Sequence, residues 1–96
     1  MTATYVTRLT TKTSDVYPTV EAWVAVHGNA GTRRPLLIGA KLVLEADGKS
    51  VIRTLEFPSE AEFQATKEEI NAENLAAGKT EADRLYTVEK ISGPGL

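Results

Sequence analysis

Residues 55–78 read LEFPSEAEFQATKEEINAENLAAG, and this stretch decides the fold because it holds the clearest helix signal in the chain. Ser59 is a favourable N-cap, and Glu62 follows three residues later, as in a capping box. Gly78 follows two alanines and can adopt the left-handed conformation that closes many helices. These signals predict a helix over residues 60–77.

A turn signal fixes the two strands that precede this helix. Residues 46–49 read Ala-Asp-Gly-Lys, and the central Asp-Gly favours a two-residue type I′ hairpin that pairs Glu45 with Ser50. In that register one face of the hairpin is apolar except at Arg53, so we expect this face to meet the helix. The apolar residues of the face are Ile38, Ala40, Leu42, Leu44, Val51, Leu55 and Phe57.

Three further segments have the composition of strands. Residues 4–12, 19–27 and 84–92 are rich in β-branched and aromatic side chains. Alternation within residues 19–27 predicts that the valines face the core and that Trp23 lies on the outer face, and uneven spacing predicts a bulge near Lys90. The element order is then β-β-β-β-α-β. It predicts an α+β fold in which an antiparallel four- to five-stranded sheet has one α-helix packed on one face.

Length and composition bound the class of protein. Ninety-six residues with 42% hydrophobic and 25% charged side chains predict a single small domain over residues 1–96. Residues 93–96, Gly-Pro-Gly-Leu, are expected to form a disordered tail. The sequence has no cysteine, no apolar leader near its start and no run approaching about 18 apolar residues. We therefore expect a cytoplasmic protein with no membrane segment.

The net charge of −2 hides an asymmetry along the chain. Residues 1–54 carry seven basic and four acidic side chains, whereas residues 55–96 carry four basic and nine acidic ones. The predicted helix is acidic, which favours a protein partner with a basic surface. The glutamates expected to contact this partner are Glu60, Glu62, Glu69 and Glu73.

Arg33 and Arg34 define a second candidate surface. They follow Gly28 and Gly31 in a predicted loop, where backbone amides and guanidinium groups can hold an anion. The loop matches no phosphate-binding pattern, so a solvated loop between two strands is the alternative interpretation.

Trp23 and the basic side chains of the first half define an alternative function, a nucleic-acid-binding sheet face. An aromatic side chain among outward-facing charges is typical of such faces. The acidic pI of about 5.4 and the absence of a recognised nucleic-acid-binding signature count against this alternative. The basic residues concerned are Arg8, Lys12, Arg33, Arg34 and Lys41.

His27 is the only histidine in the chain. As a general base it would need a nucleophile or a carboxylate nearby, and Asp15 and Glu21 are the available carboxylates. A metal site would need further ligands, which the spacing of His and carboxylate residues does not supply. We therefore expect a non-enzymatic protein with no metal and no cofactor, in which His27 is a partly exposed residue at a strand end.

These patterns favour a small non-enzymatic protein-binding module. In its size, its lack of cysteine and its acidic surface, the chain resembles phage-encoded inhibitors of bacterial defence complexes, including anti-CRISPR proteins. The resemblance implies docking on a protein partner through the acidic helix face or through the loop with Arg33 and Arg34. The other alternative is a structural subunit or a homodimer, in which sheet edges pair between copies.

Overall fold

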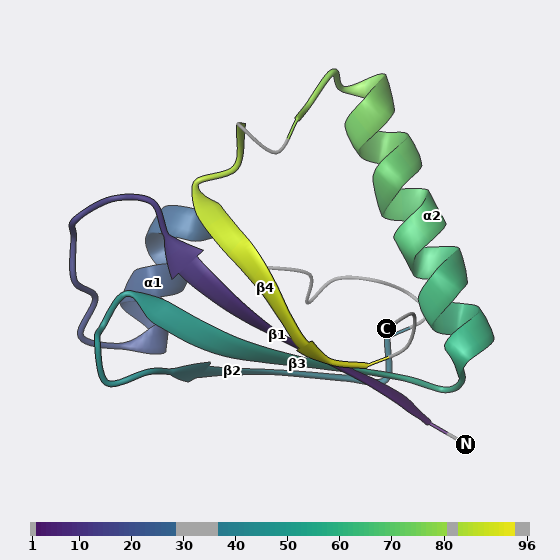
Figure 1. The fold of residues 1–96 in the computed structure, drawn as a ribbon, viewed down its shortest axis with the longest axis horizontal. Helices are drawn as coiled ribbons and strands as arrows, with labels where there is room; N and C mark the ends of the chain where they lie inside the picture. Colours follow the sequence, from purple (N-terminus) through teal and green to yellow (C-terminus); the bar gives the residue numbers. More distant parts are fainter. Residues whose placement is uncertain (1, 29–36, 81–82, 94–96) are drawn as a thin grey trace.

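The fold is α+β, with a four-stranded antiparallel sheet and two helices in the element order β-α-β-β-α-β. The structure is a computed structural model that describes residues 2–28, 37–80 and 83–93. Its elements are β1 (Ala3–Thr11), α1 (Val20–His27), β2 (Gly39–Leu44), β3 (Ser50–Phe57), α2 (Glu60–Ala76) and β4 (Tyr86–Ser92) (Figure 1). The predicted order is therefore wrong at its second element, which is a helix, and the predicted single helix is one of two.

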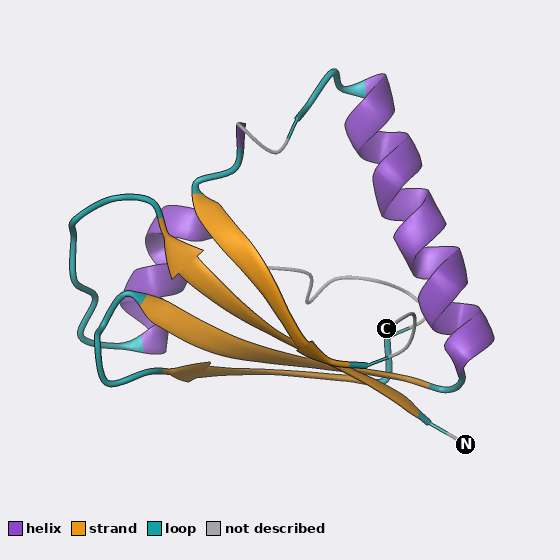
Figure 2. Cartoon of the chain, in the orientation of Figure 1, coloured by secondary structure: helices purple, strands orange, loops and turns teal. Residues whose placement is uncertain are grey.

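The strands lie in the order β2-β3-β1-β4, and each neighbouring pair is antiparallel. The chain contains two β-α-β units, β1-α1-β2 and β3-α2-β4. In the sheet, β3 lies between β1 and β2, and β1 lies between β3 and β4, so each unit is split by a strand of the other. Such an element order is that of the ferredoxin-like split β-α-β motif. Both helices lie on the same side of the sheet, and no helix of the described chain covers the other side (Figure 2).

Helix α1 replaces the strand predicted over residues 19–27. Thr19 acts as its N-cap, with Oγ1 accepting a hydrogen bond from Ala22 N at 3.1 Å. Gly28 closes the helix at a φ of +83°, and its N–H donates to Val24 O at 2.7 Å. These two caps satisfy backbone groups that an eight-residue helix would otherwise leave unpaired, and they stabilise it against its β-favouring valines.

Trp23 explains why this segment folds onto the sheet as a helix. Its side chain is 0% exposed, so the prediction that Trp23 lies on the outer face is wrong. With helical spacing, Val20, Trp23, Val24 and His27 form one stripe, and all four side chains are buried or partly buried. The spacing of apolar side chains over these eight residues is compatible with both a strand and a helix, and burial of the indole favours the helix.

The hairpin between β2 and β3 has the predicted register. Leu44 pairs with Val51 and Gly39 with Glu56, as expected from the Asp-Gly turn. The predicted turn type is wrong, because type I′ needs two residues with positive φ and only Gly48 has one here, at +68°. The bond from Gly48 N to Glu45 O, 3.1 Å long, closes the turn instead.

Asp47 holds the turn in this form. One carboxylate oxygen accepts from Lys49 N at 2.9 Å and from Ser50 N at 3.0 Å, and the other accepts from the Ser50 hydroxyl at 3.1 Å. These hydrogen bonds lower the pKa of Asp47 below its usual value, and the bond from Lys49 N has the largest effect.

The charged form of Asp47 stabilises the fold, which gives a pH-dependent prediction. Because its pKa is lower in the folded state, the stabilisation is complete above the usual aspartate pKa and is lost as the pH falls through the folded value. We expect Asp47→Asn to lower the urea midpoint at pH 7 and to differ less from the wild type as the pH becomes acidic. Asp15→Asn, at another exposed aspartate, is the control. A constant difference between Asp47→Asn and the wild type at all pH values would contradict this account.

Helix α2 confirms the prediction made from the capping signals. It spans Glu60–Ala76 with Ser59 as N-cap, and Gly78 follows with a φ of +68°. The Ser59 hydroxyl donates to the Glu62 carboxylate, so the two capping side chains bond to each other and not to backbone N–H groups. The first turn still carries its acidic residues at the positive end of the helix dipole.

The core consists of two clusters on the helix-covered side of the sheet. The first, under α1, contains Leu9, Tyr17, Trp23 and Val51. The second, under the start of α2, contains Ala3, Leu55, Phe57 and Phe63. The apolar face predicted for the hairpin is therefore only partly covered: Val51, Leu55 and Phe57 are buried under the two helices, Leu42 and Leu44 are partly buried, and Ile38 and Ala40 are exposed.

The last strand completes the sheet. Its pairing with β1 shifts between Val6, opposite Ser92, and Thr7, opposite Lys90, which confirms the bulge predicted near Lys90. The tail predicted for residues 93–96 lies outside the described residues, except for Gly93.

Candidate functional site

A cleft of about 660 Å³ separates the two core clusters, and we refer to it as the central cleft. It exists because α2 contacts the sheet only through its first turns, where Phe63 and Thr66 are buried (Figure 1). From there the helix rises away from the sheet, and Ile70 and Asn74 are only partly buried. Strand β3 lies beneath the cleft and α2 lies above it.

Arg53, on β3, lines the cleft and lies opposite Thr7 in the pairing with β1. Its Nε donates to Thr7 Oγ1 at 3.1 Å, and this polar pair separates the two apolar clusters. Burial lowers the pKa of Arg53, although a guanidinium stays charged at neutral pH. The sequence singled out Arg53 as the one charge on an apolar face, and the structure shows that it faces a cavity.

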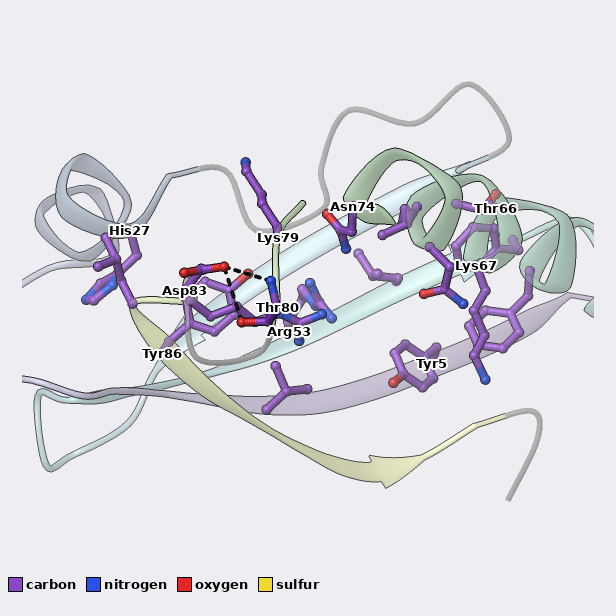
Figure 3. A pocket seen from close by; sticks show the side chains of 18 residues that line it. Tyr5, His27, Arg53, Thr66, Lys67, Asn74, Lys79, Thr80, Asp83 and Tyr86 are labelled. Carbon is purple, nitrogen blue, oxygen red and sulfur yellow. Dashed lines mark hydrogen bonds between the residues drawn. The ribbon is translucent and has the colours of Figure 1, made fainter. Parts of the chain in front are cut away.

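The charged residues in the described lining of the cleft are mainly basic. They are Arg53, Lys67, Lys79, Arg84 and Asp83. The single carboxylate among them, Asp83, accepts from Thr80 N at 2.7 Å and from the Thr80 hydroxyl at 3.2 Å (Figure 3). Sequence reasoning did not identify this lining, because its basic residues come from a strand, a helix and the segment before β4.

His27 borders the cleft at the end of α1. Its ring lies 4.5 Å from the Trp23 ring and 5.4 Å from the Tyr17 ring, measured between centroids. Its two nitrogens are buried and have no hydrogen-bond partner among the described residues. Burial lowers the pKa of His27, which favours the neutral ring. Of the two carboxylates considered as its partners, Asp15 and Glu21, neither borders the cleft.

The structure separates the residues that the sequence grouped into a nucleic-acid-binding face. Trp23 is buried under α1, on the helix-covered side of the sheet. Arg8 points to the opposite side, where its Nε lies 2.7 Å from Glu45 and a terminal nitrogen lies 2.8 Å from Glu89. The two bonds raise the pKa of Arg8, with the Glu45 bond the larger cause. The guanidinium is thus bonded to two carboxylates across the open face of the sheet.

Helix α2 brings three of its four predicted contact residues together. At about 100° per residue, Glu69 and Glu73 lie within about 20° of Glu62 around the helix axis, and we call these three residues the acidic flank. Glu69 and Glu73 are exposed and Glu62 is partly exposed. Glu60 is also exposed but lies about 160° away from Glu62, so it does not belong to the same surface.

Next to the acidic flank lies a line of small side chains, which we call the alanine stripe. It consists of Ala61, Ala65, Ala72 and Ala76, all of them exposed. Small side chains allow another backbone or side chain to approach the helix closely, and the neighbouring carboxylates can pair with cations on that partner.

The remaining candidates add no site within the described chain. Arg33 and Arg34 lie outside the described residues, so their loop is not placed. Among residues 2–28, 37–80 and 83–93, no group of three His, Asp or Glu side chains is arranged to hold a metal ion. Neither α1 nor α2, the helices within these ranges, is long and apolar enough to cross a membrane.

Comparisons with known proteins provide no relative from which a function could be transferred. No family model matches the chain, no curated protein matches it, and no solved structure matches it.

Proposed function

We propose that this protein is a small non-enzymatic binding module that docks on a basic protein surface through the acidic flank and the alanine stripe of α2. The observation that carries the proposal is that α2 stands away from the sheet with both features exposed. A helix held by only its first turns presents much more of its circumference to a partner than a helix packed along its whole length.

Charge and shape together support a protein as the partner. The three carboxylates of the acidic flank gather on one side of α2, so the cations of a partner can approach all of them from the same direction. The alanine stripe beside them provides apolar contact at low entropic cost, because alanine has no side-chain rotamers to fix. A helix face of this kind fits a basic groove, such as the nucleic-acid-binding groove of another protein.

An inhibitor of a nucleic-acid-binding defence complex is the specific form of this proposal. Such a complex has a basic groove that normally holds DNA or RNA, and a row of carboxylates on a helix can compete for it. The support for this form is the chain's size and its acidic α2.

Charge reversal of the acidic flank tests the docking surface. We expect the triple variant Glu62→Lys, Glu69→Lys, Glu73→Lys to bind its partner about 100-fold more weakly, because like charges across an interface cost several kcal/mol. The measurement is capture of proteins from a native lysate, identified by mass spectrometry, followed by titration of the captured protein with each variant.

A second triple variant separates this surface from net charge. Asp15→Lys, Glu21→Lys and Glu56→Lys change the net charge by the same amount at exposed positions outside α2. We expect this control to bind its partner like the wild type. Equal weakening by both variants, or undiminished binding by the acidic-flank variant, would remove α2 as the docking surface.

A further inference from the structure

Strand β2 forms one edge of the sheet, because β3 is the only strand of the described chain that pairs with it. In an antiparallel pair, alternate residues of a strand bond to the partner strand. Glu45 N donates to Ser50 O at 2.8 Å, so every second residue before Glu45 also bonds to β3. The backbone N–H and C=O groups of Ala40, Leu42 and Leu44 therefore point away from the sheet, and no described residue bonds to them.

The β2 edge lacks features by which many sheet edges avoid pairing with another chain, such as a bulge or several charged side chains. Its pairing with β3 is regular from Gly39 to Leu44, and Lys41 is the only charged residue of the strand. At the opposite edge, β4 has a shifted register near Lys90 and carries both Glu89 and Lys90. Of the two edges, β2 is therefore the one better suited to accept a further strand.

The sequence of β2 is complementary to itself in one antiparallel register. With a two-fold axis at Val43, the two copies of Val43 face each other, Leu42 faces Leu44, and Lys41 faces Glu45. An axis at Lys41 places two lysines opposite each other, and an axis at Leu42 or Leu44 places Val43 opposite a charged residue. Opposite charges and apolar pairs stabilise neighbouring strands, whereas like charges destabilise them, so this complementarity favours a second copy with its axis at Val43.

We propose that two copies of this chain form a symmetric dimer by antiparallel pairing of their β2 strands, which joins the two four-stranded sheets into one continuous sheet. The backbone groups of Leu42 and Leu44 in one copy bond to those of Leu44 and Leu42 in the other. The dimer is an addition to the docking function proposed for α2, and neither proposal depends on the other.

Side chains on both sides of the joined sheet support this pairing. On the open side, Val43 is 46% exposed in the single chain and meets its own copy at the close spacing of a non-hydrogen-bonded pair. Lys41 is exposed, and Arg8 Nε bonds to Oε1 of Glu45 at 2.7 Å. A carboxylate accepts through both oxygens, so Lys41 of the second copy can bond to Oε2. On the helix-covered side, the partly buried Leu42 and Leu44 lose further exposure to water.

Sedimentation velocity over a range of protein concentrations tests the dimer. The wild type is expected to change from the chain mass of 10.4 kDa to twice that mass as its concentration rises. We expect a dissociation constant of about 1–100 μM, because a single pair of strands makes a small interface. A wild type that stays monomeric up to about 1 mM would overturn the proposal and leave the β2 edge to a strand of another protein.

Variants of Val43 identify the edge and the axis. Val43→Glu and Val43→Lys are each expected to weaken self-association at least about 100-fold, because like charges then face each other across the axis. An equimolar mixture of the two variants is expected to dimerise, because the mixed pair has opposite charges. Ile91→Glu is the matched control, since Ile91 is 44% exposed on β4, and it is expected to dimerise like the wild type.

Amide hydrogen exchange of the wild type locates the pairing without a substitution. The amides of Leu42 and Leu44 are expected to gain protection as the protein concentration rises, whereas those of Lys41 and Val43, already bonded to β3, change little. Undiminished dimerisation of Val43→Glu, a mixture of folded Val43 variants that stays monomeric, or protection of Leu42 and Leu44 that does not depend on concentration would overturn the proposal.

Discussion

Replacing Trp23 with alanine is expected to remove about 3–5 kcal/mol from the free energy of unfolding. The indole is 0% exposed and packs in one cluster with Leu9, Val51 and Tyr17. Its ring also lies 5.8 Å from that of Tyr86, between centroids, so it connects α1 to β4 at the edge of the sheet. Small domains are stable by only about 5–15 kcal/mol, so this single change removes a large part of the total.

Urea unfolding followed by circular dichroism measures this effect. Val26→Ala is the matched control, because Val26 lies on the same helix and is 49% exposed. We expect the control to change the free energy of unfolding by no more than about 0.5 kcal/mol, as is usual for surface positions. A loss below about 1 kcal/mol for Trp23→Ala would show that α1 is not packed on the sheet as described.

Replacing Phe63 with alanine is expected to release α2 from the sheet. Phe63 and Thr66 are the two buried residues of the helix, and the Phe63 ring lies between Tyr5, at 4.9 Å, and Phe57, at 5.4 Å. Deleting a buried phenyl ring costs about 3–5 kcal/mol. Isolated helices of about this length are marginal in water, so α2 should unfold locally once its contact is lost.

Amide hydrogen exchange distinguishes this local event from global unfolding. Residues 60–76 are expected to lose protection in Phe63→Ala, while the paired strands β1 and β3 keep theirs. Leu75→Ala is the control, because Leu75 is on the same helix and 83% exposed. Retained protection of residues 60–76 in Phe63→Ala would mean that other contacts hold α2 in place.

The hairpin and α2 were predictable because their signals are local. The Asp-Gly turn sets the register of β2 and β3 within a few residues, and the capping residues of α2 lie within one turn of its ends. In the hairpin, however, the turn type depends on hydrogen bonds from Lys49 N and Ser50 N to the Asp47 carboxylate, which the Asp-Gly pattern does not specify.

Helix α1 was not predictable from alternation alone. Over eight residues the valines fit a strand, while Val20, Trp23, Val24 and His27 fit a helix just as well. The indole is large enough to decide between them, but only once the sheet offers a surface on which to bury it. Thr19 before this segment and Gly28 after it were the signals that favoured the helix.

The candidate site depends on long-range placement, which explains why sequence reasoning found only part of it. Arg53 stood out because it interrupts an apolar face. Lys79 and Arg84 join it only because α2 rises from the sheet and the chain returns beside β1 to form β4. Nothing near these residues in the sequence specifies the height of α2 above the sheet.

The position of β1 at the centre of the sheet affects how the chain folds during synthesis. One side of β1 pairs with β4, and the bonded side chains Arg8 and Glu89 are 81 positions apart. Until the ribosome releases β4, that side of β1 has backbone groups without a strand partner, an exposed edge that favours aggregation. Contacts this distant in sequence also slow folding, so the nascent chain should remain sensitive to proteases and chaperones until its last strand emerges.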